Sequence, residues 1–251
     1  MPSTAFVRDE INKKIPGALG FYERRSRETL ATGITALDSE IAGIPRHALS
    51  QICGPSSSGR TTLLISLLAQ ATRNGECCAL VDAMDRFDPG SAKASGVDLA
   101  QLLWVRCGGQ SRSALKIKNV KRELIPVEQA FAAADLIMQS GCFGLLAVDL
   151  ADVPSGLVAK VPLSTWFRFS RAVENKPMVL VFLLPEIAAG SYAGLVLRLA
   201  PSSPVWRGRQ DLPHSFLLRQ LDLEAVVVRT GDRKPPQPVQ PRFTAKSRWG
   251  L

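Results

Sequence analysis

The sequence predicts an α/β fold with a mainly parallel sheet, helices on both faces and an antiparallel extension toward the C-terminus. Between residues 49 and 184, short and nearly all-apolar runs alternate with segments of helical periodicity. Strands of a parallel sheet, which are buried on both faces, have this composition. A glycine-rich stretch separates the first apolar run from the first helical segment. After Leu195 the alternation stops, and strand-like segments follow one another without helices between them.

The predicted elements follow in a regular order along the chain. Apolar runs that predict buried strands occupy residues 49–54, 77–82, 102–107, 144–150 and 177–184. Helical patterns occupy residues 61–75, 126–140 and 163–176, and the first of them closes with Asn74 and Gly75, a typical C-terminal signal. Residues 195–200 and 215–229 predict two or three antiparallel strands at the edge of the sheet.

One α/β core accounts for most of the 251 residues. We expect a helical arm and linker over residues 1–29, the core over 30–230 with a basic insert at 108–123, and a proline-rich basic tail without regular structure over 231–251. No run reaches the roughly 18 unbroken apolar residues of a membrane span, and the N-terminus lacks the apolar region of a secretory signal. We therefore expect a cytoplasmic protein without membrane contact.

The formal net charge of +9 is unevenly distributed. It is consistent with a solvated basic surface or with a nucleic-acid partner. The insert supplies five candidate DNA-binding residues: Arg112, Lys116, Lys118, Lys121 and Arg122. Such side chains bind phosphates by counterion release and without base readout, whereas the alternative is a solvated loop.

The stretch "GPSSSGRTT" follows the pattern of a phosphate-binding loop, G-x-x-x-x-G-K-[ST], except that Arg60 replaces the lysine. In a strand–loop–helix setting, backbone N–H groups and the helix N-terminus attract phosphate. The candidate nucleotide-binding residues of the loop are Gly54, Pro55, Ser56, Ser57, Ser58, Gly59, Arg60, Thr61 and Thr62. Two interpretations of Arg60 remain open: its planar guanidinium binds phosphate bidentately, or it fits poorly in a loop shaped for a slim ammonium.

A second part of the candidate site is Asp149, which ends the apolar run "LLAVD". Together with the Thr61 hydroxyl, this carboxylate is placed to hold a Mg²⁺ ion, through water in the case of Asp149. The alternative is a strand-end aspartate that only caps a loop.

These motifs together resemble the nucleotide-binding core of the RecA recombinase over residues 30–107. The similarity rests on "TGITALD", the loop followed by "TT", "ALVDA", "DP" and "GVD", and "LLAVDLADV" resembles the Walker B strand. The resemblance implies a RecA-like P-loop core, with ATP and Mg²⁺ as cofactors. It also implies that Asp88 matches an aspartate that contacts adenine. The short, degenerate sequence most resembles the RecA-related accessory family ImuA, also called SulA-like or RecA-like.

Several positions depart from the RecA pattern along the path of hydrolysis. Met84 stands where the family has the glutamate that activates water, and a thioether cannot accept a proton. Asp85 is a conceivable substitute base. Ser91 replaces the aromatic platform for adenine, and Pro185 replaces the glutamine that senses the terminal phosphate.

The two segments that would be DNA-binding loops in RecA are also short here. Residues 186–194 and 151–156 stand in their places. We interpret the site as non-hydrolytic, with weak or vestigial binding of ATP and Mg²⁺.

The resemblance to ImuA implies a DNA-repair accessory role in SOS-induced translesion synthesis, beside an inactive Y-family polymerase homologue and an error-prone replicative polymerase. The expected partners are polymerase-type repair proteins or RecA, and DNA through the basic segments. Phe243 and Trp249 in the tail are candidate partner-docking residues, although a DNA-binding arm or a passive tail remains open.

Two other functions remain open. One is a slow DNA-dependent ATPase of homologous recombination, in which Arg60 serves as the lysine and Asp85 as the base. The other is a division inhibitor or another regulator that uses the fold as a binding platform.

Overall fold

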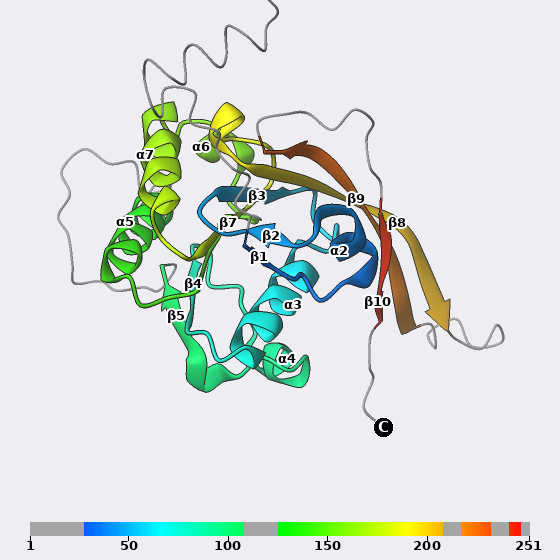
Figure 1. Ribbon diagram of the computed structural model, residues 1–251. Coiled ribbons are helices and arrows are strands. Elements are labelled where there is room, and N and C mark those ends of the chain that lie inside the picture. The colour runs from blue at the N-terminus through cyan, green and yellow to red at the C-terminus, as the bar shows by residue number, and fades with distance from the viewer. Residues whose placement is uncertain (1–27, 108–124, 208–216, 232–240, 247–251) are drawn as a thin grey trace, which may run out of the picture.

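The computed structural model contains a mixed eight-stranded sheet with the strand order β10-β9-β8-β3-β7-β6-β4-β5 (Figure 1). The structure describes residues 28–107, 125–207, 217–231 and 241–246. Most of the predicted N-terminal arm, the five basic candidates of the insert and Trp249 lie outside these ranges.

Five short parallel strands form one side of the sheet, from β3 to the edge strand β5, as the apolar runs predicted. They are β3 (Leu49–Cys53), β4 (Cys78–Asp82), β5 (Leu102–Arg106), β6 (Leu145–Asp149) and β7 (Val179–Leu184). The register aligns Cys53 with Leu184 and Asp82 with Asp149. The carboxyl ends of β3, β7, β6 and β4 therefore meet at one edge of the sheet, which is where α/β folds of this kind place their sites.

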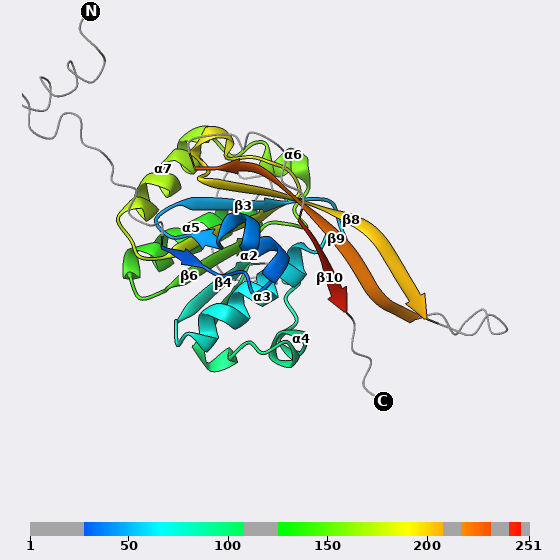
Figure 2. The same ribbon diagram turned by 45° about the vertical axis from the view of Figure 1, so that its right-hand side comes forward.

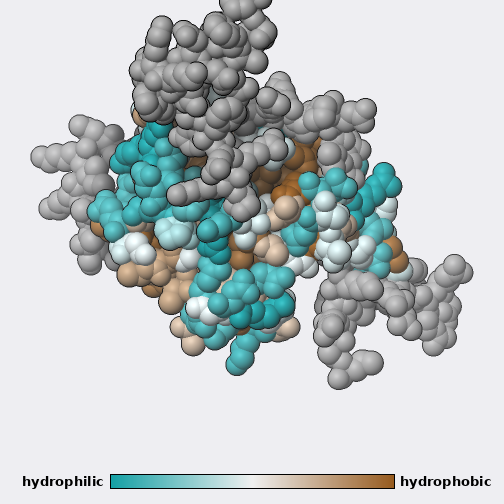
Figure 3. All heavy atoms as spheres, viewed as in Figure 1, coloured by the Kyte–Doolittle hydropathy of each residue, from teal (hydrophilic) through white to brown (hydrophobic). Residues whose placement is uncertain are grey.

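Helices cover both faces of the sheet, which confirms the predicted α/β class. On one face lie α2 (Thr35–Ile41), α3 (Arg60–Arg73) and α4 (Pro89–Ala94), and on the other α5 (Ile125–Ser140), α6 (Ser155–Val158) and α7 (Leu163–Glu174). Strand β6 shows the alternation, because Leu145 and Ala147 pack in the α3 core and Leu146 and Val148 in the α5–α7 core. The visible surfaces of α4 and α7 are mainly hydrophilic (Figure 3).

The α5–α7 core is built around aromatic rings. Four of them have neighbouring centroids 5.1 to 5.7 Å apart: Phe131, Trp166, Phe169 and Phe182. Outside the C-terminal extension, the remaining described elements are short 3₁₀ turns at Leu99–Gln101 and Gly190–Tyr192 and the pair β1 (Thr29–Leu30) and β2 (Ile44–Pro45). None of the helices in the described part of the chain has the length and apolar character needed to cross a bilayer.

The C-terminal extension is antiparallel, as predicted, and larger than the sequence indicated. Strand β8 (Leu195–Arg207) pairs in parallel with β3 through Leu195–Arg198 and then leaves the body of the sheet with β9 (Leu217–Thr230) as a long hairpin (Figure 2). Strand β10 (Arg242–Lys246) pairs with β9.

Strand β10 corrects the expectation for the tail, because residues 242–246 belong to the sheet and do not lie outside the core. Phe243 pairs with Leu223 and is only 8% exposed, in the same apolar cluster as α3. A side chain that fills the core of its own chain does not dock a partner. The docking proposal for Phe243 is therefore withdrawn.

Replacing Phe243 tests this correction. Phe243→Ala removes a buried ring, and we expect the free energy of unfolding to fall by about 3 kcal/mol. Arg242→Ala, an exposed position on the same strand, is the matched control. Urea denaturation of both variants measures the difference; equal midpoints would place the ring outside the core.

Candidate nucleotide-binding site

The glycine-rich loop connects β3 to α3, and its two glycines are required by neighbouring strands of this chain. A Cβ atom on Gly54 would collide with the backbone carbonyl of Leu199 on β8. One on Gly59, which has a φ of +90°, would collide with the side chain of Leu223 on β9. Ser57, at the tip of the loop, also has a positive φ of 61°. The loop is thus shaped by the C-terminal hairpin as well as by its own sequence.

The remaining loop residues divide into exposed and buried positions. Pro55, Ser56 and Ser57 are exposed, and so are Thr61 and Thr62 in the first turn of α3. Ser58 is only 1% exposed, and its Oγ has no hydrogen-bond partner among the described residues. The first N–H groups of a helix have no partner within the helix, so the N-terminus of α3 keeps the elements of an anion site.

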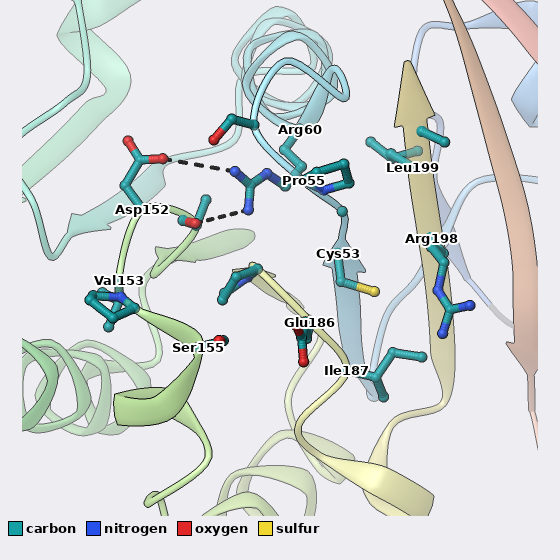
Figure 4. A pocket seen from close by; sticks show the side chains of 16 residues that line it. Cys53, Pro55, Arg60, Asp152, Val153, Ser155, Glu186, Ile187, Arg198 and Leu199 are labelled. Atoms are coloured by element: carbon teal, nitrogen blue, oxygen red, sulfur yellow. Dashed lines mark hydrogen bonds and ion pairs between the residues drawn. The ribbon is translucent and has the colours of Figure 1, made fainter. Parts of the chain in front are cut away.

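Arg60 turns away from solvent and toward the ends of two strands (Figure 4). Its Nη1 donates hydrogen bonds to the carbonyl of Leu184 at 3.1 Å and to that of Ala151 at 2.9 Å. Its Nη2 lies 3.8 Å from Oδ1 of Asp152, and the residue is 6% exposed. The guanidinium therefore joins the start of α3 to the carboxyl ends of β6 and β7.

This geometry gives a physical reason for arginine at position 60. Carbonyls at strand ends have lost their ladder partners and need donors when they are buried. A guanidinium carries several N–H groups on a long planar fork, whereas an ammonium is a compact point charge on a thinner stem. In this structure the Arg60 guanidinium is hydrogen-bonded to oxygen atoms of the protein itself.

Asp149 ends β6 beside the loop, and its Oδ1 accepts a hydrogen bond from the N–H of Ala151 at 2.9 Å. This is the bond expected of a carboxylate that caps a loop. Burial raises its pKa to about 6; the charges of Asp82 and Asp152 act in the same direction, whereas the Ala151 bond and Arg60 oppose them.

Asp82, one strand away, is a buried carboxylate that the sequence reasoning missed. It accepts hydrogen bonds from the N–H groups of Met84 at 3.2 Å and Phe87 at 2.8 Å, so it organises the turn after β4. The described residues contain no cluster of three or more histidine, cysteine or acidic side chains that fits a metal ion. The proposed Mg²⁺ ligands, Thr61 and Asp149, would thus need water and phosphate oxygens to complete the coordination.

Asp85, the conceivable substitute base, is held by Arg106. Both carboxylate oxygens accept hydrogen bonds from that guanidinium at 2.6 Å, and these bonds hold the pKa of Asp85 below its usual value. A base with a lowered pKa and both oxygens engaged is poorly suited to take a proton from water. Met84 is half-buried against the α5–α7 core.

Asp88 is the N-cap of α4. Its carboxylate accepts hydrogen bonds from the backbone N–H groups of Gly90 at 3.1 Å and Ser91 at 3.0 Å, and it remains exposed. The Ser91 hydroxyl and these N–H groups lower the pKa of Asp88. Capping of α4 explains why an aspartate stands at position 88 without any bound ligand, since aspartate is a preferred N-cap.

An open cleft of about 840 Å³ lies between the loop, the segments that follow β6 and β7, and strand β8. Four charged side chains line it: Arg60, Asp152, Glu186 and Arg198 (Figure 4). Pro185 also lines it. Sequence reasoning missed Asp152 and Arg198, although "LRL" within an apolar run marks Arg198 as the one outward-facing residue of its strand segment.

Cys53 lies at the base of the cleft and is unreactive. It is buried, and its thiol donates to the carbonyl of Leu197 at 3.3 Å. Burial raises the pKa of the thiol to about 11, so the thiolate is scarce at neutral pH.

The sequence is similar to those of known proteins. A model of the RecA N-terminal domain matches residues 9–161. The protein RecA of Pseudomonas putida is 30% identical over 169 residues, which cover 66% of this chain and 46% of the relative. RecA of Pseudomonas fluorescens strain SBW25 is also 30% identical over 169 residues, covering 66% and 47% of the two chains. The chain thus spans about half the length of the curated relatives it matches.

The raised pKa of Asp149 predicts a pH-dependent stability. The usual value is 3.8 and the folded value about 6, so folding favours the protonated form. The contribution of Asp149 to the free energy of unfolding is therefore fully present below about pH 4. It is lost as the pH rises through about 6, which lowers the free energy of unfolding by at most about 3 kcal/mol. Asp149→Asn keeps an oxygen for the Ala151 N–H and removes the titration.

Urea denaturation at about pH 4 and pH 7 checks this expectation. The variant should gain stability relative to the parent protein at the higher pH. A constant difference between the two proteins would show that Asp149 is solvated.

Proposed function

The chain belongs to the RecA family, and from that membership we propose that it is a RecA-like DNA-repair protein whose phosphate-binding loop no longer supports ATP hydrolysis. The observation that carries the proposal is the position of Arg60, which donates to the carbonyls of Ala151 and Leu184. A guanidinium that is hydrogen-bonded to carbonyls at strand ends is not placed to stabilise the negative charge on a phosphoryl group during its transfer.

Two further positions support the loss of hydrolysis. Met84 offers no proton acceptor where the family has a glutamate, and Asp85 beside it is engaged by Arg106. Pro185 lines the cleft without a side-chain amide. General base catalysis alone contributes roughly 10²-fold to 10⁴-fold in rate, so the combination leaves little turnover.

The finer role that we propose is that of an ImuA-type accessory protein in SOS-induced translesion synthesis. The short segments 151–156 and 186–194, in place of long DNA-binding loops, favour an accessory over a recombinase. Its partners would be polymerase-type repair proteins or RecA, bound through protein surfaces. Trp249 stays a candidate docking residue for such a partner.

We also propose that the protein binds nucleotide and DNA. The N-terminus of α3 would hold phosphate weakly through backbone N–H groups, with Thr61 and Asp149 as ligands of any Mg²⁺. Arg112, Lys116, Lys118, Lys121 and Arg122 would contact DNA phosphates without reading sequence. A core that extends through β10, flanked by an N-terminal arm, completes the proposed organisation.

The alternative is a slow DNA-dependent ATPase of recombination, and the intact loop geometry favours it. Gly54 and Gly59 keep the backbone shape, and the exposed Thr61 is free to meet Mg²⁺. This alternative requires Arg60 to leave two carbonyls and Asp85 to leave Arg106.

An ATPase assay with and without single-stranded DNA separates the two functions. We expect no DNA-stimulated turnover above background, and no gain in Met84→Glu alone, because the cation would still be misplaced. The double variant Arg60→Lys, Met84→Glu restores both the lysine of the loop and the glutamate base. If any variant gains ATP turnover, we expect it to be this one. DNA-stimulated turnover by the parent protein, abolished by Asp149→Asn, would establish the enzyme and refute the proposal.

A further inference from the structure

The two segments that flank the cleft are held by the same side chain. The first segment, residues 151–155, follows β6, and the second, residues 184–189, begins with the last residue of β7; we call them the first and second walls. Arg60 donates to the carbonyl of Ala151 in the first wall and to that of Leu184 in the second. Asp152 of the first wall lies 3.8 Å from the same guanidinium.

Each wall also has hydrogen bonds that the other does not share. The N–H of Ala151 donates to Asp149 at the end of β6 at 2.9 Å. The N–H of Ala188 donates to Oε1 of Gln51, a fully buried residue of β3, at 3.0 Å. Among the hydrogen bonds of the described residues, those of Arg60 are the ones that reach both walls.

In nucleotide switches, a terminal phosphate and its Mg²⁺ order the loops around the site, and the loops relax when that phosphate leaves. Here a side chain of the protein makes the ordering contacts. We infer that Arg60 is a positioning residue that replaces the nucleotide as the common holder of both walls, so that the cleft keeps one conformation with or without ATP. This inference rests on the proposed function, since it takes the loop to be non-hydrolytic.

Burial makes the arrangement hard for a ligand to reverse. Arg60 is 6% exposed, and its departure would leave two carbonyls without their donor. A ligand shifts a conformational equilibrium only by the difference between its affinities for the two states. A phosphate that drew Arg60 outward would have to offset the loss of both bonds. Contacts made through the walls are therefore constitutive and independent of the nucleotide state.

Hydrogen–deuterium exchange of the full chain tests the inference with Mg-ATP as the probe. In the parent protein, exchange in both walls should be the same with and without Mg-ATP. Arg60→Met, which keeps the length without the donors, should speed exchange in both walls together by about tenfold or more. Arg73→Met, an exposed position at the other end of α3, is the matched control and should leave both walls unchanged.

The Arg60→Lys variant distinguishes a positioning role of Arg60 from a merely structural one. The ammonium can turn to phosphate, so both walls should loosen without nucleotide and regain protection with Mg-ATP. It also keeps the test available if the methionine variant does not fold. Loosening of one wall only, or of neither, would overturn the inference, and so would protection of both walls by Mg-ATP in the parent protein.

Failure here is distinguishable from failure of the proposed function. ATP turnover by the parent protein contradicts the function whatever the exchange pattern. Nucleotide-dependent exchange without turnover contradicts only the role assigned to Arg60.

Discussion

The hydrogen bonds from Arg60 to the carbonyls of Ala151 and Leu184 are the constraint on which the site depends. They join the start of α3 to the carboxyl ends of β6 and β7. Arg46 does the equivalent at the opposite edge of the sheet. It donates to the carbonyls of Gly144 and Pro177 at 3.2 Å, just before β6 and β7 begin, and pairs with Glu76 at 2.7 Å. Guanidinium groups, buried for Arg60 and half-buried for Arg46, thus bind backbone oxygens at both edges of the sheet.

The shape of the loop also depends on contacts with other parts of the protein. The backbone of Leu199, on the C-terminal hairpin, leaves no room for a side chain at Gly54, and Gly59 has a positive φ of 90° beside the Leu223 side chain, so both glycines also have a structural role. Phe243 on β10 packs beside Leu223 and links the last strand of the sheet to the loop. A phosphate-binding motif can therefore survive in a sequence as a structural element, and its presence alone does not establish catalysis.

The sequence predicted the sheet because apolar runs and helical periodicity are local signals. The five parallel strands appear within a residue or two of the expected bounds, whereas β8 continues to Arg207, beyond the expected end at residue 200. It did not predict β10, because Phe243 is one apolar residue in a proline-rich stretch and its pairing with β9 is not local. In the site, the loop and Asp149 followed from motif and strand position. The role of Arg60 did not, since its partners lie 91 and 124 residues away and their carbonyls carry no sequence signature. Asp85 was weighed as a base, but its pairing with Arg106 arises only when β5 lies beside β4.

Whether Arg60 serves the protein fold or a phosphate is tested most directly by a crystal structure of the protein soaked with Mg²⁺ and a non-hydrolysable ATP analogue. We expect the guanidinium to stay within hydrogen-bond distance of the Ala151 and Leu184 carbonyls whether or not the analogue is seen in the loop. A guanidinium turned onto the β- or γ-phosphate, with those carbonyls released, would contradict this expectation.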